Sequence, residues 1–316
     1  MREMNNYKIF HRKQDVGKKI EQLHRSEQLA IGIIDVGSLE QLENTIQWYV
    51  ENMNFCLHVV MNLERGDINV FKKEYPDVTF IVYSSINSFG ESVNTIADEC
   101  FTNFFMIVRS DVEIIRFEGA YLFNILNGKE SPIALVPAIA NSKKEIIPSM
   151  NSPKLEGFLI NPDSYFPNMA STEVYQTLYP FMGMGLFDRA FFQRIRGYDI
   201  DIKSEYYQFL DFGIKCNEFG KTIGCTSAFI VSFPKRLSVI EDRSPIENLN
   251  KVHTRALGVQ TINGKNFAHK FRGYFDKKTF NVEVKERLIV LVKKDFKSLI
   301  KSWKYTPDEE LNRSEN

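Results

Sequence analysis

An acidic segment directly follows one of the chain's apolar runs. Arg109-Ser-Asp111-Val-Glu113 comes immediately after residues 104–108. A hard divalent cation that bridges phosphates needs few carboxylates and keeps its other positions for water and substrate, so Asp111 is a candidate ligand. In an extended chain, side chains two residues apart share a face, which would let Glu113 join it. The alternative interpretation is an acidic loop that caps the next helix.

A second carboxylate, Asp211, lies inside the largely apolar segment 205–215. A buried carboxylate costs free energy unless it is paired or performs chemistry. One hypothesis is that Asp211 transfers protons. The other is that it pairs with Lys215, four residues along the same helix.

Several common catalytic devices are absent from the sequence. It has no GxxxxGK[ST] loop, no GxGxxG after its first strand, no HExxH and no GxSxG. The 40 Lys+Arg balance the 40 Asp+Glu, so nothing favours a nucleic-acid partner. What remains is a site built from carboxylates.

The cysteines and the terminal segment bear on the compartment. The four cysteines are far apart, with no CxxC pair, which is typical of buried thiols in a reducing compartment. No apolar run approaches the roughly 18 residues that a membrane span needs. Residues 1–28 are polar, without the apolar stretch of a signal peptide. We therefore expect a soluble, cytoplasmic protein.

Apolar runs alternate with helical periodicity along the first 140 residues, which predicts an α/β fold with a parallel sheet wrapped by helices. Ligands of such sheets bind beyond the carboxyl ends of the strands. The predicted strands are 29–34, 55–60, 78–83, 104–108 and 133–137, and the predicted helices are 39–50, 68–75 and 93–101.

The second half is less regular. Residues 141–180 are rich in Asn, Ser and Pro and are expected to form irregular loops over a cleft. Regular patterns resume at 185–196, 206–219 and the strand-like 228–233.

Residues 265–304 carry 12 Lys+Arg against 4 Asp+Glu. Here the spacing predicts a basic amphipathic helix that either packs on the rest of the protein or lies on an anionic membrane surface. Its apolar face would be formed by Val284, Leu288, Val292, Phe296, Leu299 and Trp303.

Five short segments, in order, resemble motifs of the family 2 glycosyltransferases, over about residues 29–230. The segments are Phe89-Gly-Glu-Ser-Val-Asn94, Phe105-Met-Ile-Val-Arg-Ser-Asp111, Val136-Pro137, Gly183 to Asp199, and Phe209-Leu-Asp211-Phe-Gly-Ile-Lys215 with Phe219-Gly220. The resemblance implies a GT-A fold, Rossmann-type, with a mixed and mostly parallel sheet and a helical C-terminal extension. It would divide the chain into a polar leader (1–28), a catalytic domain (29–233) and the extension (234–316).

The resemblance also implies an activity: inverting transfer of a sugar from a UDP-sugar or other nucleotide sugar to a glycan or lipid-linked acceptor. The pathway would be cell-surface polysaccharide synthesis. Mn²⁺ or Mg²⁺ held by Asp111 would neutralise the leaving diphosphate, and Asp211 would be the catalytic base. His253 is a candidate second metal ligand. The resemblance places the donor beside Asp35, Asn62, Asn94, Arg109 and Asp111.

The chain departs from the family in both acidic motifs. The DxD-type motif reads Arg109-Ser-Asp111 and the ED pair reads Leu210-Asp211, so each keeps only its last acid. One alternative is therefore a catalytically impaired GT-A domain that binds or scaffolds. Another is a sugar nucleotidyltransferase, which the acidic loop Asp35-Val-Gly-Ser38 disfavours, because such enzymes usually carry a Gly-rich basic loop there.

Overall fold

The computed structural model describes residues 6–16 and 28–304. Its centre is a ten-stranded sheet in the order β1-β4-β3-β2-β5-β13-β7-β14-β12, with β6 paired to β14. Its strands are β1 (Tyr7–Phe10), β2 (Leu29–Ile34), β3 (Cys56–Asn62), β4 (Val78–Tyr83), β5 (Phe104–Arg109), β6 (Glu113–Phe117), β7 (Ala134–Ala140), β12 (Tyr175–Thr177), β13 (Gly185–Asp188) and β14 (Ile223–Ser232).

Strand direction decides which residues meet at one edge of this sheet. Strands β4, β3, β2 and β5 are parallel neighbours. Strand β13 is antiparallel to both β5 and β7, and β14 is parallel to β7. The strands β2, β3, β4, β5, β7 and β14 therefore all point the same way, and their carboxyl ends share an edge.

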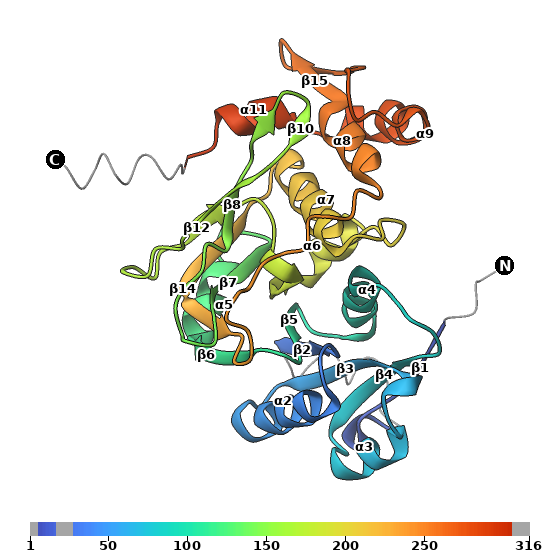
Figure 1. Ribbon diagram of the computed structural model, residues 1–316, viewed down its shortest axis with the longest axis vertical. Coiled ribbons are helices and arrows are strands. Elements are labelled where there is room, and N and C mark those ends of the chain that lie inside the picture. The colour runs from blue at the N-terminus through green and yellow to red at the C-terminus, as the bar shows by residue number, and fades with distance from the viewer. Residues whose placement is uncertain (1–5, 17–27, 305–316) are drawn as a thin grey trace.

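Helices cover both faces of the sheet because its strands are apolar on both faces. On one face pack α2 (Leu39–Asn52), α3 (Ile68–Glu74) and α5 (Gly119–Leu126). On the other pack α4 (Phe89–Glu99), α6 (Arg189–Arg194) and α7 (Glu205–Glu218). Figure 1 shows α2 and α3 on the opposite side of the sheet from α4.

The α/β prediction is confirmed, and the predicted strands 29–34 and 78–83 match β2 and β4 residue for residue. Residues 185–196 form strand β13 followed by helix α6, rather than one element. Periodicity missed β13 because its first three residues are buried between two neighbouring strands, so they carry no alternation.

The loop-like region 141–180 contains short strand pairs, so the expectation of wholly irregular loops there was wrong. They are β8 (Met150–Ser152) with β11 (Asp163–Tyr165), and β9 (Leu155–Glu156) with β10 (Leu159–Ile160). Three-residue 3-10 helices occur at Lys13–Asp15, Leu63–Arg65 and Phe181–Gly183.

The C-terminal region is not one amphipathic helix. It consists of α8 (Leu249–Leu257), the hairpin β15 (Val259–Ile262) and β16 (Lys265–Ala268), α9 (Lys277–Thr279), the π-helix η4 (Phe280–Leu288), α10 (Ile289–Leu291) and α11 (Phe296–Lys301). The helical run ends at Val292, whose ψ of 123° is extended. The backbone N–H groups of Lys293 and Lys294 then donate to the carbonyl of Glu218.

The apolar side chains of this region are buried in the protein. Val284 and Val292 belong to a small cluster with Phe280, while Phe296 and Leu299 join the main core beside α7 and α8. The predicted membrane contact is therefore not supported, because those side chains already have protein neighbours. No helix among residues 6–16 and 28–304 has the length and apolar character to cross a bilayer.

Two valines of the C-terminal region test this packing. Val284 is 0% exposed and Val290 is 77% exposed. We expect Val284→Ala to lower the free energy of unfolding by about 2 kcal/mol, from the lost methyl groups and the cavity left behind. Val290→Ala should change it by less than about 0.5 kcal/mol. Urea unfolding of both variants makes the comparison, and equal small effects would contradict burial of this face.

Candidate functional site

Two arginines and one aspartate meet at the carboxyl-end edge of the sheet. Arg109 is the last residue of β5, and Arg236 lies four residues beyond the end of β14. The Nε of Arg109 donates to Oδ1 of Asp111 at 3.1 Å, and Nη2 of Arg236 donates to Oδ2. The buried carboxylate of Asp111 thus has a guanidinium on each oxygen.

Aromatic rings hold both guanidinium groups. The guanidinium carbon of Arg236 lies 4.9 Å from the ring centre of Phe233, and that of Arg109 lies 6.0 Å from the ring centre of Phe89. Such contacts are favourable because the face of the ring is negative. The turn after β14 is fixed by backbone bonds from Phe233 N to Ala140 O and from Arg236 N to Phe233 O. Both cations are thereby held in place.

A pocket of about 460 Å³ opens beside the two arginines. Glu205, the first residue of α7, lies 3.8 Å from Nη1 of Arg109, and about half of its side chain is exposed. Lys203 also lines the pocket. Ser204 caps α7 by accepting a hydrogen bond from Tyr207 N, which fixes the start of the helix. The pocket therefore combines cations with accessible carboxylates, of which Glu205 is the one that pairs with Arg109.

Glu241 braces the wall of this pocket. Its carboxylate accepts hydrogen bonds from the backbone N–H of Met182 at 2.9 Å and from the hydroxyl of Tyr179 at 2.7 Å. Burial raises the pKa of Glu241, although these bonds and Arg243 oppose the rise. With both oxygens engaged, its role here is to hold the loop before β13.

Asp35 follows β2 at the same edge, as the sequence indicated, but its carboxylate is already paired with an arginine. Arg65 donates to both of its oxygens, at 2.8 and 3.0 Å, and also to the carbonyl of Gly37. Ser110 joins the ends of β2 and β5, since Val36 N donates to its hydroxyl at 2.9 Å. These contacts build the edge on which a ligand could lie.

The two predicted asparagines differ. Asn62, at the end of β3, has a buried Oδ1 with no hydrogen-bond partner, so an acceptor is left unsatisfied at this edge. Asn94 accepts from the backbone N–H of Tyr198 and donates to its carbonyl, at 2.9 and 2.8 Å. Its amide is therefore used to join α4 to the loop before α7.

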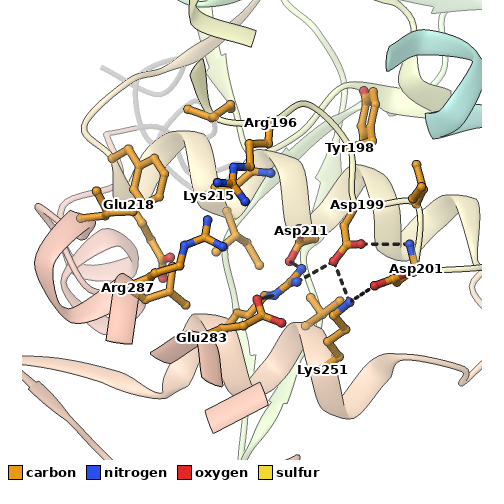
Figure 2. Close-up of a pocket in the computed structure, with 18 of the residues that line it drawn as sticks. Arg196, Tyr198, Asp199, Asp201, Asp211, Lys215, Glu218, Lys251, Glu283 and Arg287 are labelled. Atoms are coloured by element: carbon orange, nitrogen blue, oxygen red, sulfur yellow. Dashed lines mark hydrogen bonds and ion pairs between the residues drawn. The ribbon is translucent and has the colours of Figure 1, made fainter. Parts of the chain in front are cut away.

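Asp211 faces a second pocket, of about 520 Å³, between α7 and the C-terminal helices (Figure 2). Arg255 on α8 donates to Oδ1 of Asp211 at 2.9 Å, and it also pairs with Asp199 and Glu283. Lys251 pairs with Asp199 and Asp201. Oδ2 of Asp211 is buried and has no partner.

The structure does not bring Asp111 and Asp211 to one site. Asp211 lies six residues after Glu205, which places it about 240° around α7 and about 9 Å further along. The pocket of Asp211 shares no lining residue with the pocket of Arg109. The sequence hypothesis that Asp211 pairs with Lys215 is wrong as well, because Nζ of Lys215 donates to Gly197 O at 2.7 Å and Arg255 pairs with Asp211.

Burial and charge shift several pKa values around the second pocket. Burial alone would raise the pKa of Asp199, but Arg255 and Lys251 outweigh it and lower that pKa to about 2. Burial lowers the pKa of Lys215, although Asp211 opposes this. Burial raises the pKa of Glu218 well above its usual range, and Asp211 adds to the rise. The pocket thus combines a tight ion-pair network with a carboxyl that favours its neutral form.

His253 is a structural residue in this arrangement. Its Nε2 accepts a hydrogen bond from Ile160 N at 2.8 Å, and its Nδ1 lies 2.9 Å from Leu249 O. The side chain is fully buried. Both ring nitrogens have partners, so His253 has none left for a metal, which corrects the suggestion drawn from the family resemblance.

The residues at the sheet edge do not fit the divalent metal that the resemblance implies. Each oxygen of Asp111 is paired with an arginine, and Arg109 stands where the first acid of the motif would be. Across the described ranges, no group of three His, Cys, Asp or Glu side chains could hold a metal ion. A divalent cation here would have to share the carboxylate of Asp111 with two guanidinium groups, whose positive charges repel it.

Two residues of these sites were missed in the sequence. Arg236 follows the predicted strand 228–233 by three residues. Its place could have been inferred had that strand been taken as parallel to 104–108. Arg255 had no signal, because only folding brings α8 against α7.

No protein-family model matches the sequence, and no curated protein matches it. Solved structures do match. A crystal structure of GalNAc-T7 with UDP, GalNAc and Mn²⁺ aligns with a TM-score of 0.57 at 14% identity over 73% of this chain. Staphylococcus aureus TarS aligns with a TM-score of 0.50 at 13% identity over 73% of this chain. These neighbours are GT-A-type glycosyltransferases, so the chain has the GT-A fold. It spans 48% of the GalNAc-T7 chain and 39% of the TarS chain.

The buried histidine predicts acid sensitivity. Burial lowers the pKa of His253 from 6.5 to about 4, although its bond to Leu249 O opposes this. The unfolded chain therefore binds a proton at His253 more readily than the folded chain does, and stability falls as the pH drops through that window. We expect this histidine to account for roughly 3 kcal/mol of unfolding free energy lost between about pH 7 and pH 4.

The measurement is urea unfolding of wild type and His253→Gln at several pH values. The variant should be less stable at neutral pH and should lose less on acidification. His269, unlike His253, is only partly buried, so His269→Gln is the control and should retain the wild-type pH dependence. Identical pH profiles for wild type and His253→Gln would contradict the assignment.

Proposed function

We propose that this chain is a glycosyltransferase that moves a sugar from a nucleotide-sugar donor to a hydroxyl of an acceptor. The observation that carries the proposal is the Arg109–Asp111–Arg236 cluster at the carboxyl-end edge of a GT-A sheet, beside a pocket with an accessible carboxylate. Ligands of open α/β sheets bind at this edge. Two cations held there suit the diphosphate of such a donor.

The donor would lie along the edge from β3 to β5. The unsatisfied Oδ1 of Asn62 suits a hydrogen-bond donor on the nucleotide base, and the loop of Asp35 and Arg65 would support the nucleoside. The GalNAc-T7 structure was determined with UDP, GalNAc and Mn²⁺. By analogy, a UDP-sugar is the first donor to test, with other nucleotide sugars after it.

Glu205 is the residue we assign as proton acceptor. It lies beside Arg109 at the mouth of the pocket, so an acceptor hydroxyl bound there could reach it. In this role Glu205 would take the hydroxyl proton as the new bond to the anomeric carbon forms. The family motif predicts Asp211 as the base, but the ion pair of Asp211 with Arg255 favours a structural role.

The finer features stay proposals that rest on the resemblance to family 2 glycosyltransferases: inversion, a glycan or lipid-linked acceptor, and cell-surface polysaccharide synthesis. The resemblance implies Mn²⁺ or Mg²⁺ at Asp111, but the contacts of Asp111 with two arginines argue against a metal at this site. A second candidate function is a GT-A domain that binds a nucleotide sugar without transferring it. The loss of the first acid in both motifs favours this candidate.

Transfer assays on three variants test the base assignment. Glu205→Gln is nearly isosteric, so we expect the transfer rate to fall about 10²–10⁴-fold with little change in melting temperature. Asp211→Asn should instead lower the melting temperature, because it weakens one ion pair of Arg255, and should largely keep the rate. Glu247→Gln, an exposed acid of the same pocket, is the control and should behave like wild type.

The opposite pattern, in which Asp211→Asn is inactive but stable and Glu205→Gln stays active, would identify Asp211 as the base. Wild type that binds nucleotide sugar but transfers none to any acceptor tested would favour the binding domain.

A further inference from the structure

We propose that Arg109 and Arg236, held by Asp111, replace the divalent cation in neutralising the diphosphate of the donor. The inference rests on the proposed function and extends it to how the leaving group is stabilised. It also assigns a binding role to Arg236, which lies outside all the segments that carry the family resemblance.

Charge counting supports the replacement. Two guanidinium groups and one carboxylate give the Arg109–Asp111–Arg236 cluster a formal charge of +1, counted without Glu205, which lies 3.8 Å from Nη1 of Arg109. A divalent cation on a single carboxylate would leave the same +1. A diphosphate that approaches the cluster would therefore meet equal net charge in either case, and arginine supplies directed hydrogen bonds to phosphate oxygens as well.

Asp111 makes the pair possible. Two guanidinium groups would repel each other at close range, but a carboxylate between them offsets that repulsion, and each oxygen binds one of them. A metal at Asp111 would have to share these oxygens with the guanidinium groups and would be repelled by their charge. The arrangement thus favours arginine and diphosphate over a metal at this position.

Arg236 is the group that a ligand can reach. Its side chain is 39% exposed, whereas that of Arg109 is 9% exposed. Both line the pocket of about 460 Å³ that also contains Glu205. A guanidinium has five N–H donors, so Arg236 keeps donors for phosphate while one nitrogen binds Asp111. Its guanidinium carbon lies 4.9 Å from the ring centre of Phe233.

The reaction balances without a metal. The bond between the anomeric carbon and the β-phosphate oxygen breaks, and its electron pair stays on that oxygen. The acceptor oxygen bonds to the anomeric carbon, and its proton passes to Glu205. The nucleoside diphosphate gains negative charge as it leaves, and the two arginines would stabilise that charge, as arginine does in phosphoryl transfer.

Calorimetric titration of the full chain tests the inference. The probes are inorganic pyrophosphate and UDP, ADP, GDP and CDP, each titrated with EDTA and again with MgCl₂ or MnCl₂. We expect the preferred nucleoside diphosphate to bind with a Kd that changes by less than a factor of about three between the two conditions. Pyrophosphate should compete with it, whereas the nucleoside alone should bind more weakly.

Arg236→Gln should weaken nucleoside-diphosphate binding about tenfold to a hundredfold in either condition, since a hydrogen bond to a charged group is lost. Arg236→Lys should restore part of the affinity. Lys235→Gln changes the exposed neighbouring cation and is the matched control, with unchanged affinity. Melting temperatures verify that each variant is folded.

Nucleotide binding that requires Mg²⁺ or Mn²⁺ would overturn this inference and leave the proposed function intact. Metal-independent binding that Arg236→Gln does not weaken would overturn the role of the arginine. If no nucleotide or nucleotide sugar binds in either condition, the inference and the proposed function both fail.

Discussion

The carboxylate of Asp111, shared between Arg109 and Arg236, is the interaction on which the candidate site depends. It is buried, and an unpaired buried carboxylate would be costly, so the ends of β5 and β14 must bring their arginines together. That requirement can be met because β13 runs antiparallel between β5 and β7. Because β5 and β14 run in the same direction, Arg109 and Arg236 lie at the same edge of the sheet.

Helix α7 separates two chemically different pockets. Its first turn presents Glu205 beside Arg109, while its far face carries Asp211 into the ion-pair network of Arg255 (Figure 2). The C-terminal region packs on that far face and supplies Arg255 and Glu283. The second pocket therefore lies between α7 and the C-terminal helices, whereas the first lies between the end of β5, the start of α7 and the segment after β14.

The GT-A fold and the charge of the edge together narrow the chemistry. A sheet of this type binds ligands at the carboxyl ends of its strands, and here that edge carries guanidinium groups rather than a pair of acids. Asp35 and Ser110 do different work there, since their contacts join neighbouring segments of the edge. Asn94 joins α4 to the loop before α7.

The sequence alone determined the α/β class, the strands at 29–34 and 78–83, and the place of Asp111 after a strand, because local apolar runs and turns encode those features. It could not determine β13, the break at Val292, or the partners of Asp211 and His253. Those depend on contacts between residues far apart in the chain, such as Arg255 with Asp211 and Ile160 with His253. Whether a carboxylate binds a metal, moves a proton or pairs with arginine is decided by such neighbours, and only the tertiary structure supplies them.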